Sequence, residues 1–367
     1  MNTDKLKLLL ALQEDPIAPA AKLAKQVGVT PPTARAWLDS LRDEKVYVSV
    51  QANILGRRLG LEMDDFLLKV DSYDSLEKIE QFCEAHPYTS YRARVFGGDD
   101  HGIMVQFRQP DEARSHLLDA FDIMKKKGIV TNIRELPTLR TEYGSTYTRP
   151  RLDAWNPERM VWEFDWDKWW NNQPSDVKSP DTKTTQEETI TLDHLDVQIL
   201  QHIHMNARRK NTDIIESLGF DKNTPGVQQK ISAKLKRLKN EVIESYRVFI
   251  NWTHFDVYNT PLIIAKAHSK TSDRLVKHLS DSNFPFGSSI RKTLDGFVWS
   301  ARLPSGHFSE LVGLVWKISK NFEVLILDFK HSQIYGLWAD AFDGESSTWR
   351  LEREFCFEMP LKSIGIL

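Results

Sequence analysis

Apolar residues follow a helical spacing in much of the stretch 192–252, most clearly in the run after Thr224. There they recur every three or four residues, which predicts a helix with one buried stripe. These residues are Val227, Ile231, Leu235 and Leu238. Thr224 can cap this helix and Pro225 suits its first position. Two shorter helical patterns come before it, and a strand-like alternation comes after it. The order helix, helix, turn, helix and strand predicts a winged helix-turn-helix.

The stretch 1–55 repeats this pattern. Two short helical segments lead to a third helix, which follows Thr30 and Pro31, again a cap and a first-position proline. Ala34, Leu38 and Leu41 are expected to face inward on this helix. A strand-like alternation of valines follows. The sequence therefore predicts a second winged helix-turn-helix at the start of the chain.

The stretch 61–145 alternates between strand and helix patterns. Its order is strand, helix, two strands, helix and strand, which is the ferredoxin-like order. The same order returns at 260–335, where Asp295 and Gly296 form a tight hairpin turn. The expected fold class is therefore α+β, with two copies of a winged helix-turn-helix followed by a ferredoxin-like βαββαβ domain.

An internal repeat extends beyond these domains. Two aromatic pairs lie 187 residues apart, Trp155 with Trp162 and Phe342 with Trp349. Residues 146–170 and 336–367 are therefore predicted to be equivalent tails of two repeats. The tryptophans of the first tail could stack on bases, but acidic neighbours favour a packing role, over a sheet or over the other repeat. Residues 171–191 have almost no apolar content, so a linker is expected there.

Composition limits the function classes. The chain has 367 residues, of which 41% are hydrophobic, and a net charge of −2, so several domains are expected and a generally basic coating protein is excluded. Cys83 and Cys356 are its only cysteines, too few for a disulfide framework or a four-cysteine zinc site. No apolar run is long enough for a membrane span and no secretory leader is apparent. A cytoplasmic protein without a membrane partner is expected.

Positive charge is concentrated around the predicted helix of the second module. Residues 208–239 contain nine Lys or Arg and three Asp or Glu, whereas residues 20–45 contain five and three. This local excess favours double-stranded DNA as a partner over a merely solvated surface. The residues expected to contact DNA lie on the outer faces of the two third helices. They are Thr33, Arg35, Ala36 and Trp37 in the first module, and Gln228, Gln229, Lys230, Ser232, Lys234 and Arg237 in the second.

Several segments resemble the Lrp/AsnC family of prokaryotic transcription regulators. They are Val29 to Leu41, Gly56 to Gly60, and Leu192 to Leu200. The resemblance implies a sequence-specific DNA-binding regulator, in which a winged helix-turn-helix is joined to a ferredoxin-like domain for ligand sensing and oligomerisation. A tandem of two such units in one chain is suggestive of archaea.

The resemblance also implies an assembly and an effector site. Lrp/AsnC subunits pair through their sheets, so this chain is expected to form an intramolecular pseudo-dimer, which could associate further. Effectors of the family, such as amino acids, bind near the turn between the second and third strands. The residues that correspond to this site are Gly97, Gly98, Asp99 and Asp100.

The sequence contains no strong catalytic motif. It has neither a phosphate-binding glycine loop nor a His-Glu-x-x-His helix. His194, His202 and His204 could form a metal site, but polar positions on a helix are the simpler interpretation. We therefore expect no enzyme, no catalytic residues, no metal and no cofactor.

The alternative is a siroheme decarboxylase-like enzyme of the same fold. That family carries a His-Asn-Tyr-Arg-like run on the second strand of the sensing domain. The corresponding segments here begin at Tyr91 and Ser288, and neither contains the histidine.

Overall fold

The structure is a computed structural model of the chain. It describes residues 3–97, 101–136, 145–148, 150–172, 188–281 and 284–367. No helix in these ranges is both long enough and apolar enough to cross a membrane. The predicted linker lies mostly outside the described residues.

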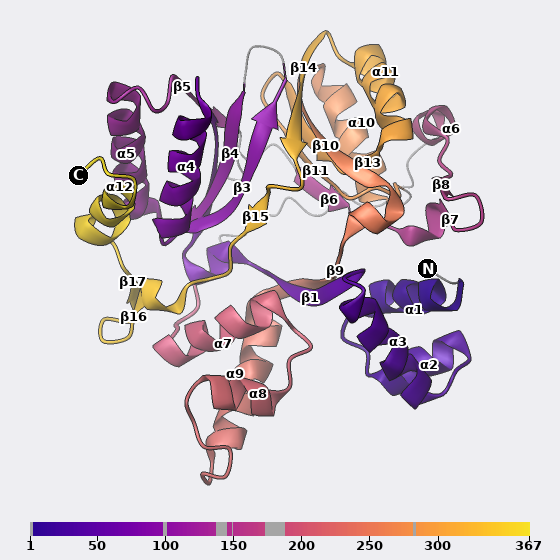
Figure 1. Cartoon of the computed structure of the whole chain (residues 1–367), viewed down its shortest axis with the longest axis vertical. Coiled ribbons are helices and arrows are strands. Elements are labelled where there is room, and N and C mark those ends of the chain that lie inside the picture. Colours follow the sequence, from indigo (N-terminus) through magenta and orange to yellow (C-terminus); the bar gives the residue numbers. More distant parts are fainter. Residues whose placement is uncertain (1–2, 98–100, 137–144, 149, 173–187, 282–283) are drawn as a thin grey trace.

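Two helical modules, one in each half of the chain, have matching element orders. The first consists of α1 (Thr3–Glu14), α2 (Ala20–Val27), α3 (Pro31–Asp43) and β1 (Tyr47–Ile54). The second consists of α7 (His194–Met205), α8 (Asn211–Ser217), α9 (Val227–Glu241) and β9 (Ile243–Ile250). β1 and β9 pair antiparallel, so that Val50 lies opposite Val248. The two modules are therefore joined through a two-stranded ribbon (Figure 1).

The starts of the two third helices differ. Thr30 caps α3 as predicted, since its hydroxyl accepts a hydrogen bond from the Thr33 amide, and Pro31 is the first helical residue. The predicted cap of α9 is wrong. Gly226, with φ of 83°, precedes the helix, and α9 begins at Val227. A left-handed residue cannot continue a right-handed helix, so Thr224 and Pro225 lie in the turn before it.

An antiparallel sheet runs through both halves. From the first half it takes β2 (Glu62–Lys69), β3 (Thr89–Phe96), β4 (Gly102–Gln109), β5 (Asn132–Leu136) and β6 (Ser145–Thr148). From the second half it takes β10 (Val257–Lys266), β11 (Ser288–Lys292), β12 (Gly296–Ala301), β13 (Leu303–Pro304), β14 (Asn321–Asp328) and β15 (Gln333–Ile334). Its main order is β5-β2-β4-β3-β14-β10-β12-β11-β6. β3 pairs with β14, which joins the two halves edge to edge.

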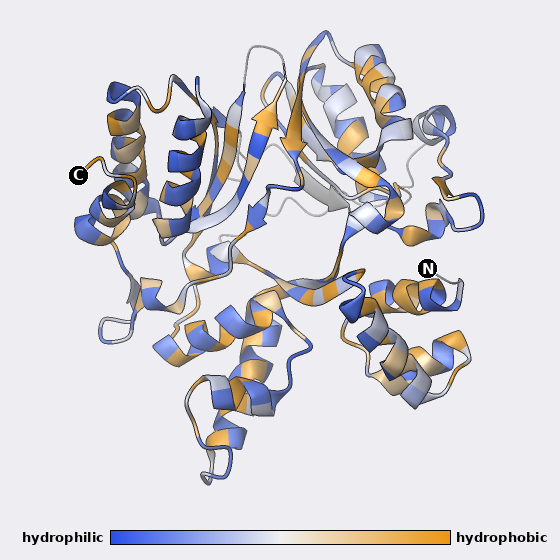
Figure 2. Ribbon diagram, in the orientation of Figure 1, coloured by the Kyte–Doolittle hydropathy of each residue, from blue (hydrophilic) through white to orange (hydrophobic). Residues whose placement is uncertain are grey.

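Each half of the sheet is covered by its own pair of helices. The helices are α4 (Tyr73–Ala85) and α5 (Arg114–Lys126) in the first half, and α10 (Ser269–Ser280) and α11 (Phe308–Ile318) in the second. Alternate residues of β2 show the layering, because Phe66 and Leu68 pack in the core with α4 and α5 whereas Leu67 packs with residues of the second half. α4 has a hydrophilic outer side, while β3 and β14 carry hydrophobic residues (Figure 2).

The face that contains Leu67 is one contact between the two halves of the sheet. It forms one apolar cluster with contributions from both. The buried members are Leu67, Ala93, Val95, Met104 and Leu136 from the first half, and Leu262, Val298, Leu325 and Leu327 from the second. Because both faces of these strands are buried, the two halves are packed as one body.

Each tryptophan-containing tail packs against the half of the chain to which it does not belong. The first tail contains β7 (Trp155–Asn156), β8 (Val161–Trp162) and α6 (Trp166–Asn171), and the second contains β16 (Phe342–Asp343), β17 (Thr348–Trp349) and α12 (Met359–Ser363). The Trp162 indole donates to the Phe255 carbonyl in the second half, at 2.6 Å, and the Trp349 indole donates to the Leu59 carbonyl in the first, at 2.7 Å. Each tail therefore covers the other repeat, and the packing interpretation of the tryptophans is confirmed.

The α+β composition is confirmed by these elements.

Candidate functional site

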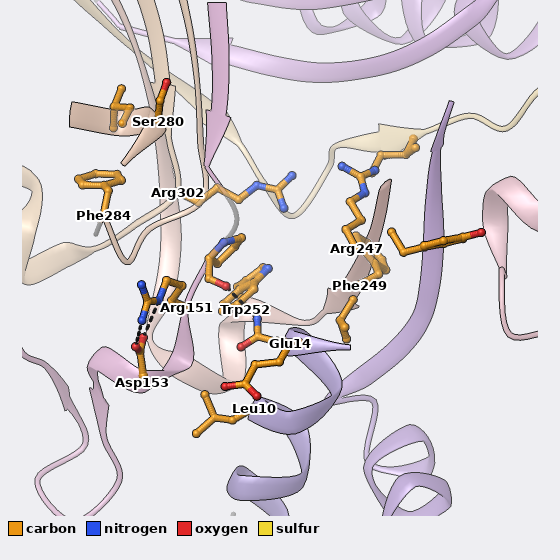
Figure 3. Close-up of a pocket in the computed structure, with 16 residues that line it drawn as sticks. Leu10, Glu14, Arg151, Asp153, Arg247, Phe249, Trp252, Ser280, Phe284 and Arg302 are labelled. Carbon is orange, nitrogen blue, oxygen red and sulfur yellow. Dashed lines mark hydrogen bonds and ion pairs between the residues drawn. The ribbon is translucent and has the colours of Figure 1, made fainter. Parts of the chain in front are cut away.

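A cavity lies between the β1–β9 ribbon and the sheet. Its two adjoining parts have volumes of about 450 and 270 Å³ and share Arg247, Arg302 and Ile334 in their lining. Together they fall within the range of about 300–1,000 Å³ that ligand pockets occupy. Residues from both halves of the chain line the cavity, so neither half forms it alone. Figure 3 shows its larger part.

Two arginines reach this cavity from equivalent positions of the two sheets. Gly102 pairs with Lys69 at the start of β4, and Arg108 follows six residues later. Gly296 pairs with Lys266 at the start of β12, and Arg302 likewise follows six residues later. The internal repeat therefore supplies one arginine from each half.

A third arginine comes from the ribbon. Arg247 of β9 lies opposite Gln51 of β1, and its Nε donates to the Gln51 side-chain oxygen at 2.9 Å. Gln51 is buried, so this bond fixes the arginine against the strand pair. In Figure 3 the guanidinium groups of Arg247 and Arg302 extend from different elements into the open middle of the cavity.

None of these three arginines forms an ion pair with a carboxylate in the described part of the chain. Arg302 lies over the Phe329 ring, at 5.2 Å. Burial, together with the nearby Arg247, lowers the pKa of Arg108 to about 10. Partly buried positive charges that repel one another are costly unless an anion joins them. The arrangement is therefore suited to a ligand with several negative charges.

Most other charged residues that line the cavity form ion pairs with residues of opposite charge. Arg151 pairs with Asp153, and Arg291 pairs with the buried Asp65. Glu14, at the end of α1, is exposed. The positive excess is therefore concentrated on Arg108, Arg247 and Arg302, where the two parts of the cavity meet.

The two parts differ in character. The larger part contains Leu10, Val248, Phe249, Trp252, Leu279 and Phe284. The smaller part contains Ser288, Ser289, Ser300 and four arginines. The cavity thus offers an apolar surface beside a cluster of cationic and hydroxyl groups, which matches a large ligand with an apolar body and carboxylate side chains.

His204, from α7, also lines the smaller part. Its Nδ1 lies 3.0 Å from the Ala52 carbonyl oxygen. A carbonyl oxygen only accepts hydrogen bonds, so Nδ1 carries the proton and Nε2 holds the lone pair in the neutral ring. Burial and the nearby Arg108 and Arg247 lower the pKa of His204 to about 3, which keeps the ring neutral in the unliganded cavity.

The three histidines considered as a metal site do not come together. The Nδ1 atom of His202 is hydrogen-bonded to the Arg209 guanidinium, at 2.8 Å, whereas His204 faces β1 and the cavity. The described residues contain no group of three metal-ligating side chains.

The predicted DNA-contacting residues lie on the surfaces of α3 and α9, away from the cavity lining. Most are exposed: Arg35, Ala36, Gln228, Gln229, Lys230 and Ser232. Thr33 and Trp37 are half-buried, and Trp37 packs against the core of its module. Lys234 and Arg237 instead form ion pairs with the buried Asp196 of α7. These two cations hold α9 against α7.

The predicted effector turn lies largely outside the described residues, since Gly98, Asp99 and Asp100 fall there. Gly97 has φ of 138°, and a side chain on it would meet the Val324 carbonyl oxygen of β14 at 2.9 Å. The need for glycine at position 97 is therefore explained by close packing of two strands. The effector site at this turn stays a prediction.

The three arginines of the cavity were not singled out from the sequence, and His204 was considered only as a metal ligand. Arg108 and Arg247 lie on two strands and Arg302 directly follows a third, and these three positions are distant in the chain. The one available signal was their placement in the repeat, because Arg108 and Arg302 follow equivalent glycines by the same six residues.

Comparison with known proteins relates this arrangement to an enzyme fold. No protein-family profile matches the chain, and no curated protein matches it. The crystal structure of the siroheme decarboxylase NirDL is similar over 99% of this chain and 99% of that chain, with a TM-score of 0.58 and 13% identity. NirDL in complex with an iron-uroporphyrin III analogue is similar over 89% of this chain and 91% of that chain, with a TM-score of 0.53 and 13% identity.

Regulators of the Lrp/AsnC type are similar over a smaller part. AsnC of E. coli covers 37% of this chain and 90% of its own, with a TM-score of 0.29 and 16% identity. The expectation that the chain is not an enzyme is wrong, because the solved structure that is similar over 99% of this chain is that of a decarboxylase. At 13% identity the likeness to NirDL is one of fold, and it extends through the whole chain.

Proposed function

We propose that this chain is a siroheme decarboxylase-like enzyme that binds a carboxylate-rich tetrapyrrole in the cavity between its two halves. The observation that carries the proposal is the set of three arginines, Arg108, Arg247 and Arg302, which face one cavity without a carboxylate partner among the described residues. Arginine is well suited to carboxylate recognition, because its planar guanidinium group can donate two parallel hydrogen bonds.

The proposal includes the architecture expected from the sequence. Each half would consist of a winged helix-turn-helix, a ferredoxin-like domain and an aromatic tail, with the two halves paired as an intramolecular pseudo-dimer. The strand orders β5-β2-β4-β3 and β14-β10-β12-β11 support this, since they are equivalent orders in the two halves. The exchanged tails support it as well, because each indole bonds to the other half.

The division of the cavity supports a flat, apolar ligand with charged side chains. The macrocycle of a tetrapyrrole would lie against Phe249, Trp252 and Phe284 of the larger part. Its carboxylates would meet the arginines where the two parts adjoin. In the reaction a side-chain carboxylate leaves as CO₂ and a proton takes its place on carbon. The arginines would hold the carboxylates in position, and neighbouring carboxylates that do not react would serve as anchors.

Titration with siroheme tests the binding half of this proposal. We expect the Soret band to shift on addition of the protein and to saturate at one siroheme per chain, because both halves contribute to a single cavity. Metal-free uroporphyrin, which has acetate and propionate side chains, should bind as well, whereas a porphyrin without carboxylates should not. Absence of any spectral change at micromolar siroheme, with a folded protein, would contradict the proposal.

A second candidate function is regulation of transcription through duplex DNA, with a small-molecule effector. The observation that favours it is the exposed surface of α9, where Gln228, Gln229, Lys230 and Ser232 are available to a partner. Short amide and hydroxyl side chains suit the edges of bases, and Lys230 suits a phosphate. Thr33, Arg35, Ala36 and Trp37 would provide the corresponding surface of the first module.

Variants of α9 test whether its exposed residues bind DNA or only stabilise the fold. Replacing Lys230 by Ala is expected to weaken DNA binding and to reduce the slope of log affinity against log salt by about 0.9. Replacing Gln228 and Gln229 should change sequence preference. Lys234→Ala serves as the comparison, since Lys234 pairs with Asp193 and Asp196 and its loss should lower stability instead. Gel-shift assays at several salt concentrations measure the affinity for DNA. An affinity that does not depend on salt would show that this surface does not bind DNA.

A further inference from the structure

His204 is the residue of the smaller part of the cavity whose ordinary pKa, about 6.5, lies nearest to neutral pH. The groups that share the smaller part of the cavity with it are Arg108 of β4, Arg247 of β9, Arg291 of β11 and Arg302 after β12, with Tyr91 of β3 and Tyr335 after β15. Burial raises the pKa of Tyr91, and it raises that of Tyr335 to about 12. A guanidinium group does not act as a proton donor or acceptor in proteins near neutral pH. Among the lining groups of the smaller part, the histidine is therefore the one that a bound ligand could bring to titrate near neutral pH.

The position of His204 is fixed by its surroundings. It is buried, at 6% exposure, and Nδ1–H donates to the Ala52 carbonyl of β1. Because that bond holds one side of the ring, the other nitrogen, Nε2, keeps its lone pair, and it has no hydrogen-bond partner among the described residues. The ring is thus held in one tautomer on the cavity wall, among cationic groups.

A carboxylate-rich ligand would reverse the electrostatics at this site. In the unliganded cavity, Arg108 and Arg247 oppose protonation of the ring. When carboxylates pair with these two arginines, the repulsion is neutralised and negative charge lies close to the imidazole. Both changes favour the protonated form of the histidine. The charge that the substrate brings would therefore create the acid that its reaction requires.

We propose that His204 takes up a proton when the substrate fills the cavity and delivers that proton, from Nε2, to the carbon atom that loses CO₂. The bond between this carbon and the carboxylate breaks, its electron pair stays on carbon, and CO₂ leaves. The Nε2–H bond then breaks as the new C–H bond forms, and the neutral ring is restored. The sum is one carboxylate and one proton converted to one C–H bond and CO₂, with no oxidant or reductant. This inference rests on the proposed function.

The proton uptake can be measured without turnover. Uroporphyrin is titrated into the protein by calorimetry between pH 6 and 8, in buffers that differ in ionisation enthalpy, so that protons bound on complex formation are counted. The pKa of His204 is about 3 in the unliganded protein and higher in the complex. Between these two values binding takes up a proton, and affinity rises as the pH falls, by up to about tenfold per pH unit.

His204→Asn is the informative variant, because an asparagine amide can replace Nδ1–H as donor to Ala52. It should bind uroporphyrin within about threefold of the unmodified chain at pH 8, without proton uptake. With siroheme, kcat should fall about 100-fold or more while KM changes little, as for loss of a general acid. His202→Asn is the control, since His202 lies on the same helix but contacts Arg209. It should leave uptake and kcat unchanged.

The outcomes separate the two proposals. If the unmodified chain does not bind uroporphyrin, the proposed function fails, and this inference with it. If it binds without proton uptake, or if His204→Asn takes up as many protons as the unmodified chain, the role of His204 is overturned while the binding site stands. Proton uptake by the unmodified chain is measured without any variant, so the test holds even if His204→Asn does not fold.

Discussion

Replacing Arg108 and Arg302 together by alanine is expected to weaken binding of uroporphyrin by about 100-fold or more. A hydrogen bond to a charged group contributes about 1.5–3 kcal/mol, and each 1.4 kcal/mol corresponds to a factor of about ten in affinity. The two arginines come from equivalent positions of the two halves, so their loss removes anchors on both sides of the ligand. Quenching of tryptophan fluorescence during titration measures the change, with Trp252 in the cavity wall as a reporter.

The same double variant should not be less stable in the absence of ligand. Neither arginine forms an ion pair with a carboxylate among the described residues, and Arg108 lies among other positive charges, so removing both relieves repulsion. Arg42→Ala with Arg159→Ala is the matched control, since these side chains are 53% and 71% exposed and pair with neighbours on the surface. If the control weakens binding as strongly as the double variant, the effect is one of overall charge and the cavity is not the site.

Replacing Trp162 by alanine is expected to lower the free energy of unfolding by about 3–5 kcal/mol, the usual cost for a buried tryptophan. Trp162 is 7% exposed, packs against Trp155 and Phe286, and donates to the Phe255 carbonyl at 2.6 Å. Because this tail belongs to the first repeat and covers the second, the loss also loosens the contact between the halves. Urea unfolding followed by circular dichroism measures the effect.

Trp316 provides the comparison, because it is 76% exposed on α11. Trp316→Ala should change stability by less than about 0.5 kcal/mol, as for most surface substitutions. Equal effects at the two positions would show that the exchanged tail contributes no special stability. A Trp162→Ala protein that unfolds in two separate transitions would show, in addition, that the tails are needed to couple the halves.

Much of the fold could be predicted from local patterns. The stripe of Val227, Ile231, Leu235 and Leu238 marked α9, and the 187-residue repeat marked two equivalent tails. The start of α9 was misplaced, because the turn depends on the backbone of Gly226 and not on the capping preference of Thr224. Pairing of β1 with β9 was not foreseen either. An alternating strand fits either a free wing or a paired ribbon, and only the partner strand decides between them.

The site could not be predicted in the same way. Sequence patterns drew attention to helix surfaces and to a glycine-rich turn, because clustered charge and turn formers are visible locally. The cavity instead joins Arg108, Arg247, Arg302 and His204 from four distant segments. Each looks like an ordinary polar position when it is considered alone. The expectation of a non-enzyme followed from the absence of spaced motifs, and a carboxylate-binding cavity needs none.

Incubation of the purified chain with siroheme in the absence of oxygen, followed by mass spectrometry of the extracted tetrapyrrole, tests the central claim most directly. We expect products that have lost one or more CO₂ units, formed by the unmodified chain and not by the variant in which Arg108 and Arg302 are replaced. Siroheme that stays bound and unchanged, under conditions where NirDL converts it, would contradict the assignment of this cavity as a decarboxylase site.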